Sequence, residues 1–253
     1  MDMGGAQKYR PMAERTQAGP ATLVAGDGFA RQTASAVPAL WKQCDTVLLD
    51  MDGTLLDLSF DNWFWREAVP RCVARLHGRG AGDIREQLFD KFSRKQGSLE
   101  WYCLDYWTTE LGLDLRALKA ASSHRIRYLP GARTFLQQAA ASGKRLVLVT
   151  DAHADTLAVK TGVLGLAGFF EICVSSHEFG TPKESPEFWP QLHDRLCFDR
   201  DHTLFVDDSV PVLDAACAFG MGAVVAITRP DTRQPVRGVA RHHTIEGVMG
   251  LLG

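Results

Sequence analysis

The sequence VLLDMDGTLLD, residues 47–57, joins a short apolar run to two aspartates that stand one residue apart. An apolar run of this length is typical of a parallel strand that is covered on both faces. Asp50 and Asp52 occupy positions i and i+2 of an extended segment, so both side chains point the same way. Because like charges repel in a poorly solvated place, the pair requires a bound cation, a shared proton or a substrate of complementary charge.

Four further apolar runs are predicted to be strands, at residues 145–150, 171–176, 203–207 and 223–228. Helical patterns lie between the later runs. Residues 131–143 and 209–220 carry apolar side chains at helical spacing, and each segment ends in a glycine, which is a common helix stop. Strands that alternate with helices predict an α/β protein with a doubly wound parallel sheet.

Residues 58–126 interrupt this alternation. The segment contains no convincing strand and holds four of the six tryptophans, at positions 63, 65, 101 and 107. Trp101, Leu104 and Leu111 follow helical spacing. We therefore expect a helical insertion directly after the first strand.

The predicted organisation is a core formed by residues 41–57 and 127–253, with the insertion between its two parts. Residues 1–40 are rich in Gly, Ala, Gln and Thr and show no clear periodicity. This composition is typical of a segment that cannot bury enough apolar surface to fold, so the sequence predicts a disordered tail there.

The overall composition excludes several classes of protein. A net charge of −2 argues against binding to nucleic acid polymers or anionic membranes through bulk charge. No window approaches the ~18 apolar residues of a membrane span, and no secretory signal is recognisable. The six cysteines form no C-x-x-C pair and the eight histidines lack metal-ligand spacing. These features favour a cytoplasmic protein with free thiols over a disulfide framework or a zinc site.

Polar residues gather at the predicted strand ends, where open parallel sheets bind their ligands. They are Asp50, Asp52, Thr150, Asp151, Asp207 and Asp208, joined by Lys183 on a loop stiffened by Pro182 and Pro186. Several carboxylates without an excess of lysine require a hard cation, and Mg²⁺ prefers such oxygen ligands. A lysine and a threonine beside them suit a phosphoryl group, whose charge is spread over several oxygens.

Four segments, DMDGTLLD, VLVTDAH, TPKES and FVDDS, occur in the order of the four motifs of the haloacid dehalogenase-like hydrolases. The resemblance covers residues from about 45 to 228, and most members of this superfamily are Mg²⁺-dependent phosphatases. The helical insertion lies where the superfamily carries its first-type cap domain. Residues 60–70, 101–107 and 179–184 also resemble the bacterial GMP/IMP nucleotidases within the superfamily.

The resemblance implies a role for each motif residue. Asp50 would be the nucleophile that forms an aspartyl-phosphate, and Asp52 the general acid and base. Mg²⁺ would be held by the Asp50 carboxylate, the backbone carbonyl of Asp52 and the Asp208 carboxylate. Asp207 would reach the metal only through water. Gly53 would let the chain turn sharply beside the phosphate.

Thr150 and Lys183 would bind the phosphate, and Lys183 would also neutralise charge as Asp50 reacts. Position 151 is Asp where Asn is commoner in the superfamily, so Asp151 is expected to point away from the phosphate or to act through its backbone N–H. Position 184 is Glu where many relatives have Pro, and the GMP/IMP nucleotidases also have Glu there. His153, close after Thr150, is expected to begin a helix, with a role in the site as the alternative.

The sequence thus predicts an enzyme that hydrolyses the 5′-phosphate of purine nucleotides such as GMP and IMP. The alternative substrate is another small phosphate ester, such as a sugar phosphate or phosphoglycolate. More distant alternatives are a phospho-acceptor module and a non-catalytic binding protein. The aromatic residues of the insertion are expected to build mainly its own core, and one or two of them would stack on a purine base. They are Trp63, Trp65, Trp101, Tyr102, Tyr106 and Trp107.

Overall fold

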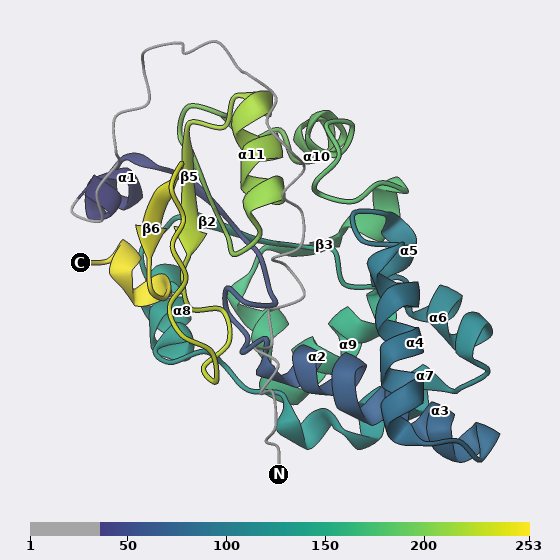
Figure 1. Ribbon diagram of the computed structural model, residues 1–253. Coiled ribbons are helices and arrows are strands. Elements are labelled where there is room, and N and C mark those ends of the chain that lie inside the picture. Colours follow the sequence, from purple (N-terminus) through teal and green to yellow (C-terminus); the bar gives the residue numbers. More distant parts are fainter. Residues whose placement is uncertain (1–35) are drawn as a thin grey trace. The chain divides into compact units, whose positions relative to one another are not determined.

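The structure is a computed structural model, and it describes residues 36–253 (Figure 1). Its centre is a six-stranded sheet in the order β3-β2-β1-β4-β5-β6, with every pairing parallel. The strands are β1 (Thr46–Leu49), β2 (Arg145–Thr150), β3 (Ile172–Ser175), β4 (Thr203–Asp207), β5 (Ala223–Ile227) and β6 (His243–Ile245). The predicted α/β class and parallel sheet are confirmed. The sequence did not predict β6, which has three residues and pairs only with β5.

Helices cover both faces of the sheet, which explains why its strands are apolar runs rather than alternating ones. Helices α10 (Phe188–Leu196) and α11 (Val210–Phe219) contribute Trp189 and Leu213 to a buried cluster with Val147 and Phe205 of the sheet. Helix α8 (Ala132–Ala140) and helix α1 (Val37–Gln43) lie on the opposite side in Figure 1. The ring of Trp41 packs edge-on against Phe135 there, with 5.5 Å between centroids.

Helix α1 corrects the predicted boundary of the N-terminal tail. Val37 and Trp41 are buried in this helix, so residues 37–40 are not part of a disordered segment. The helix forms because Pro38 stands in its first turn and two apolar side chains four residues apart meet the same buried surface. The predicted tail over residues 1–35 lies outside the described residues.

All elements between residues 59 and 125 are helical. They are α2 (Ser59–Trp63), a π-helix (Phe64–Ala68), α3 (Val69–His77), α4 (Ala81–Ser93), α5 (Leu99–Tyr102), α6 (Leu104–Leu111), α7 (Leu115–Ala121) and a 3₁₀ turn (Ser123–Arg125). Phe92 packs edge-on against Trp65, Trp101 and Trp107, and Trp107 is fully buried. The described residues form one compact unit, and the division into a core and a separate cap domain stays a prediction.

Three more elements complete the carboxyl edge of the sheet. Helix α9 (Ala154–Leu164) follows β2, a 3₁₀ helix η6 (Ser176–Phe179) follows β3, and the Lys183 loop comes before α10. None of the helices in residues 36–253 is both long enough and apolar enough to cross a membrane.

Candidate active site

The carboxyl edge of the sheet brings Asp50, Lys183 and Asp207 into direct contact. Nζ of Lys183 donates to Oδ1 of Asp50 at 2.6 Å and to Oδ2 of Asp207 at 2.7 Å. It also donates to the backbone carbonyl of Val149 at 3.2 Å. This convergence follows from the topology, because β1 lies between β2 and β4 and all three strands end at one edge.

Asp208 lies beside this group and packs against Gly53. The carboxylates of Asp50, Asp207 and Asp208 each place an oxygen within 4.8 Å of the others. Gly53 has a φ of +91°, and a Cβ at this position would lie 2.6 Å from Cγ of Asp208. The glycine therefore provides both the turn after β1 and the space that Asp208 occupies.

Arg237 holds Asp208 from the other side, a contact that the sequence motifs did not predict. Its Nη2 atom lies 3.2 Å from Oδ2 of Asp208 and also donates to the backbone carbonyl of Asp208. Arg237 is one of four arginines between residues 229 and 241, and nothing in the sequence distinguishes it from the others.

Burial and crowding shift the protonation equilibria of these groups. Burial raises the pKa of Asp50, with Lys183 opposing the rise and Asp207 and Asp208 adding to it. Burial also raises the pKa of Asp208 to about 7, against the opposing effect of Arg237. The pKa of Lys183 lies well above its usual value, because its carboxylate partners outweigh the effect of burial.

The three carboxylates fit a hard divalent cation. All the donor atoms are oxygens, which Mg²⁺ prefers. Oδ2 of Asp50 is buried and has no hydrogen-bond partner among residues 36–253, so it is available to a further ligand. The side chain of Asp52 does not belong to this cluster.

Asp52 instead enters a buried ionic network that sequence reasoning missed. Its Oδ1 lies 2.6 Å from Nζ of Lys160 on α9, and the same ammonium donates to Oδ2 of Asp61 at 2.6 Å. Lys119 on α7 continues the network, 3.3 Å from Oδ1 of Asp61 and 3.4 Å from the hydroxyl of Thr156. Both lysines are almost completely buried.

Burial and the contact with Lys160 have opposite effects on the pKa of Asp52. Burial raises it, and the net shift is upward although Lys160 opposes it. Burial would lower the pKa of Lys160, but the two carboxylates it contacts outweigh burial and raise it. The ammonium thus stays charged, and Asp52 has a charged partner that is supplied by a distant helix.

Thr150 and Asp151, at the end of β2, are buried beside the Lys183 loop. Oγ1 of Thr150 accepts the N–H of Ala152 at 3.1 Å. Oδ1 of Asp151 accepts the backbone N–H of Lys183 at 2.9 Å, and burial raises the pKa of Asp151 to about 7. The Asp151 carboxylate therefore holds the loop that carries Lys183. The role of Thr150 and Asp151 in binding substrate stays a prediction.

Two aromatic residues of the helical segment make polar or cation–π contacts. The hydroxyl of Tyr102 donates to the Glu184 carboxylate, which joins α5 to the Lys183 loop. One face of the Trp63 indole is covered by the guanidinium of Arg125, 4.1 Å from the ring centroid. Trp63 and Arg125 line a cavity of about 60 Å³.

The arrangement is closed around its reactive groups. Asp50 is 5% exposed, and Thr150 and Lys183 are each 2% exposed. Neither the small cavity at Trp63 nor a shallow one of about 440 Å³ along α9 and η6 is lined by these residues. Asp50, Thr150 and Lys183 are thus almost completely covered, whereas the neighbouring side chains of Asp52 and Asp208 are 21% and 14% exposed.

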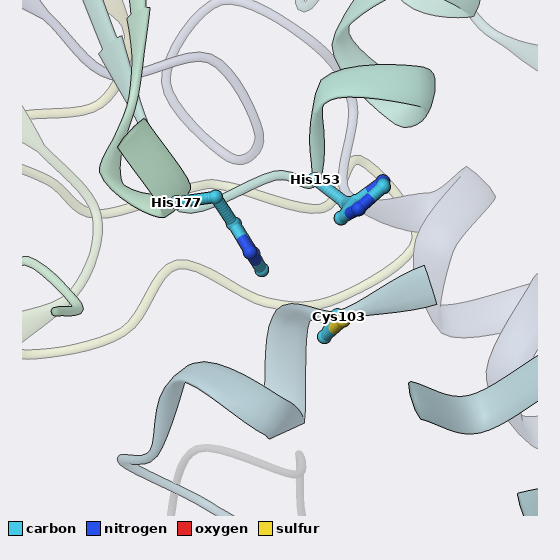
Figure 2. Close-up of side chains that lie close together, drawn as sticks. All are labelled: Cys103, His153 and His177. Atoms are coloured by element: carbon cyan, nitrogen blue, oxygen red, sulfur yellow. The ribbon is translucent and has the colours of Figure 1, made fainter. Parts of the chain in front are cut away.

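A second group of ligand-type side chains lies around one small space (Figure 2). Cys103, His153 and His177 each place a potential ligand atom within 4.8 Å of the others. His153 is the N-cap of α9, as the sequence predicted for a helix-start residue. The six cysteines are free, also as predicted, but the spacing of cysteines and histidines along the chain gave no sign of this cluster.

Comparisons with known proteins agree with the geometry. A family model for haloacid dehalogenase-like hydrolases matches residues 44–220. The chain is 38% identical over 212 residues to the GMP/IMP nucleotidase YrfG of Escherichia coli K12, covering 84% of this chain and 96% of that protein. The protein of the same name from Shigella flexneri matches to the same extent.

Solved structures share the fold at lower identity. A haloacid dehalogenase-like phosphatase from Thermococcus onnurineus superposes with a TM-score of 0.71 at 22% identity, over 82% of this chain and 95% of that one. The hydrolase YfnB from Bacillus subtilis, described as bound to magnesium, gives 0.63 at 18% identity, over 83% and 97% of the two chains. The L-2-haloacid dehalogenase of Xanthobacter autotrophicus gives 0.54 at 18% identity, over 83% and 96%.

Proposed function

Because the chain belongs to the haloacid dehalogenase-like hydrolase family, we propose that it hydrolyses phosphate monoesters at the carboxyl edge of its sheet. The family match confirms the resemblance that the four sequence motifs indicated. One observation carries the proposal: Lys183 bridges Asp50 and Asp207 while Asp208 lies within ligand distance of both. A carboxylate nucleophile, the Lys183 ammonium and further carboxylate oxygens thus lie together in one buried site.

In the first proposed step, a carboxylate oxygen of Asp50 attacks phosphorus and the ester P–O bond breaks. Oδ1 of Asp50 is held by Lys183 and Oδ2 has no partner within the described part of the chain, so the carboxylate is oriented with one oxygen free. The leaving oxygen takes a proton from Asp52, whose raised pKa suits an acid. The product is an aspartyl-phosphate at Asp50 and the free alcohol.

In the second step, water attacks the phosphorus of the aspartyl-phosphate and gives its proton to Asp52. The bond between Asp50 and phosphorus breaks, and inorganic phosphate leaves. Lys183 and the Thr150 hydroxyl would bind phosphate oxygens throughout both steps. Thr150 and Lys183 are each 2% exposed, and Lys183 contacts Asp50 directly.

Mg²⁺ is the proposed cofactor, with the carboxylates of Asp50 and Asp208 and the backbone carbonyl of Asp52 as its ligands. When bound, it would offset the repulsion between the Asp50 carboxylate and the phosphate. The unpartnered oxygen of Asp50 and the all-oxygen donor set support this assignment. Asp207 is engaged by Lys183 and by the N–H of Ser209, in keeping with its expected place outside the direct ligands.

A purine nucleoside 5′-monophosphate is the proposed substrate. The support is the 38% identity to a protein named GMP/IMP nucleotidase over 84% of this chain, a match that includes most of the helical segment. Trp63 is the aromatic residue that we assign to the base, because it lines a cavity together with Phe60 and Arg125. Trp107 is buried in the aromatic cluster of the helical segment and packs against other rings.

The experiment is a screen of phosphate release from nucleoside monophosphates, sugar phosphates and phosphoglycolate, with Mg²⁺ and with EDTA. We expect GMP and IMP to be turned over fastest and chelation to abolish turnover. A preference for a sugar phosphate would support the proposed phosphatase activity and exclude the proposed nucleotidase activity. Absence of turnover with every ester, including para-nitrophenyl phosphate, would reject the enzyme.

The base site is tested by Trp63→Ala. We expect this variant to raise KM for GMP and IMP and to leave KM for ribose 5-phosphate unchanged, because ribose 5-phosphate has no base to stack. Trp101→Ala is the matched control, since it removes an indole that packs against Phe92 rather than lining the cavity. Equal changes for all three substrates in Trp63→Ala would show that this residue does not contact the base.

A further inference from the structure

The cluster formed by Cys103, His153 and His177 joins three segments that are distant in the sequence. Cys103 stands between α5 and α6 in the helical segment, His153 begins α9, and His177 lies in η6 after β3 (Figure 2). Their potential ligand atoms lie within 4.8 Å of one another. The cluster therefore spans from the helical segment to two loops at the carboxyl edge of the sheet.

His177 presents a lone pair to this space. Its ring hydrogen-bonds the backbone of Asp151, while its Nε2 atom is buried with no hydrogen-bond partner in residues 36–253. An imidazole that is anchored through one nitrogen can offer its other nitrogen to a metal ion.

His153 and Cys103 are also oriented by their surroundings. Nε2 of His153 lies 3.6 Å from Oδ2 of Asp105, which is the carboxylate partner that metal-binding histidines commonly use. Its Nδ1 atom accepts the N–H of Asp155 at 3.4 Å and lies 3.4 Å from Oδ2 of the same residue. Sγ of Cys103 accepts the N–H of Tyr106 at 3.4 Å, as the N-cap of α6.

The nearby carboxylates are already neutralised by a cation. Arg116 forms ion pairs with both Asp105 and Asp155. The remaining ligand-type groups of the cluster are therefore one sulfur and two imidazole rings. Such a borderline-soft set selects zinc and its congeners over Mg²⁺, which needs oxygen ligands.

We propose that Cys103, His153 and His177 form a binding site for a transition-metal ion of the Zn²⁺ type, separate from the Asp50 centre. A tetrahedral zinc site places neighbouring ligand atoms about 3.5 Å apart, so rotations of the three side chains are enough to close the triangle. A water molecule takes the fourth position. A bound ion ties the helical segment to the loop after Thr150 and to η6.

The test is spectroscopic and does not depend on phosphatase activity. The full chain, freed of metal by chelation, is titrated with Co²⁺ and then with Zn²⁺ in competition. We expect a thiolate-to-cobalt charge-transfer band in the near ultraviolet, visible d–d bands of a tetrahedral ion, and their loss as Zn²⁺ displaces Co²⁺. Zn²⁺ is also expected to raise the melting temperature, because the three ligands meet only in the folded chain.

The variants are chosen so that folding is preserved. Cys103→Ser keeps an N-cap side chain for α6 but removes the thiolate, and we expect it to lose the charge-transfer band. His177→Gln is expected to weaken Co²⁺ binding by about 100-fold or more, since loss of outer partners alone weakens sites by ~10–100-fold. Cys197→Ser removes an exposed thiol outside the cluster and should bind like the wild type.

Three results would overturn the proposal. They are the absence of any charge-transfer band in the wild type, a band that persists in Cys103→Ser, and unchanged affinity in His177→Gln. Asp208→Asn serves as the control for the other centre, because its cobalt spectrum should match that of the wild type even though its hydrolytic activity is lost. Circular dichroism of each metal-free variant establishes that it is folded before titration.

Discussion

Nζ of Lys183 lies 2.6 Å from Oδ1 of Asp50 and 2.7 Å from Oδ2 of Asp207, so one ammonium neutralises two neighbouring buried carboxylates. This sharing makes the charge balance of the site robust to the loss of either acid. A substitution at Asp50 should therefore change catalysis more than it changes the stability of the fold.

Asp50→Asn should therefore lose activity and keep its fold. The substitution preserves the shape of the side chain and removes the nucleophile, while Lys183 retains Asp207 and the carbonyl of Val149 as partners. We expect kcat to fall by about 10³-fold or more. Phosphate release and urea unfolding measure the two effects.

The matched control for this variant is Asp57→Asn, the same chemical change at a buried aspartate outside the carboxylate cluster. Its folded fraction should retain activity. Wild-type turnover in Asp50→Asn would remove Asp50 from the role of nucleophile.

Gly53→Ala should damage the cation site more than it damages the fold. The added Cβ would lie 2.6 Å from Cγ of Asp208, and the φ of +91° is strained for any L side chain. Displacement of Asp208 by about 1 Å is enough to reduce turnover by about 10²-fold. We expect a higher Mg²⁺ concentration for half-maximal activity, measured by titrating Mg²⁺ into the assay.

Gly112→Ala is the control for Gly53→Ala, because it adds backbone strain without displacing a neighbouring side chain. Gly112 has a φ of +62° at the end of α6, and a Cβ there would meet nothing within 4 Å. Both alanine variants should lose about 1–2 kcal/mol of unfolding free energy through backbone strain. Only Gly53→Ala should change the Mg²⁺ dependence, and equal dependence in both would show that Asp208 is not displaced.

The strands and the motif residues were predictable because their signals are local. β1, β2 and β4 are continuous apolar runs, and Asp50, Thr150 and Asp207 mark their ends. A parallel sheet then brings strand ends to one edge regardless of sequence distance. Strand β6 escaped prediction because it has only three residues, and two of them are the polar His243 and Thr244.

The partners of these residues were not predictable from local pattern. Lys160 and Lys119 lie on helices, where a lysine ordinarily indicates a solvated face. Their burial follows from the packing of α7 against α9, which places both ammonium groups over Asp61. The cluster of Cys103, His153 and His177 was hidden for the same reason, since its members meet only through tertiary packing.

Lys160→Met should destabilise the protein strongly. The ammonium lies 2.6 Å from both Asp52 and Asp61, so its loss leaves two carboxylates in a buried place with only Lys119 nearby. Breaking a buried ion pair by removing one partner costs about 3–5 kcal/mol. Denaturant unfolding of the variant measures the loss.

A double-mutant cycle with Asp61→Asn tests whether the charge, rather than the lysine chain, is responsible. The double variant Lys160→Met/Asp61→Asn should be more stable than the sum of the two single effects predicts, because the second change removes one of the unpaired carboxylates. Strict additivity would show that Lys160 and Asp61 do not interact.

Asp57→Asn should show a loss of stability that depends on pH. Burial raises the pKa of Asp57, but hydrogen bonds from Thr232 and Ser59 outweigh burial and bring the pKa below the unfolded value of 3.8. A carboxyl group with a lowered pKa in the folded state stabilises that state above pH 3.8, and the contribution disappears as pH falls through the folded-state value. At neutral pH we expect the variant to lose about 2 kcal/mol, the usual magnitude for hydrogen bonds to a charged group. The difference between wild type and variant should then shrink in denaturant titrations at successively lower pH.

Thr232→Val removes one of the donors and leaves the charge, so it should produce a smaller loss with the same dependence on pH. A constant difference at every pH would mean that Asp57 stabilises the fold through packing and not through its ionised carboxylate.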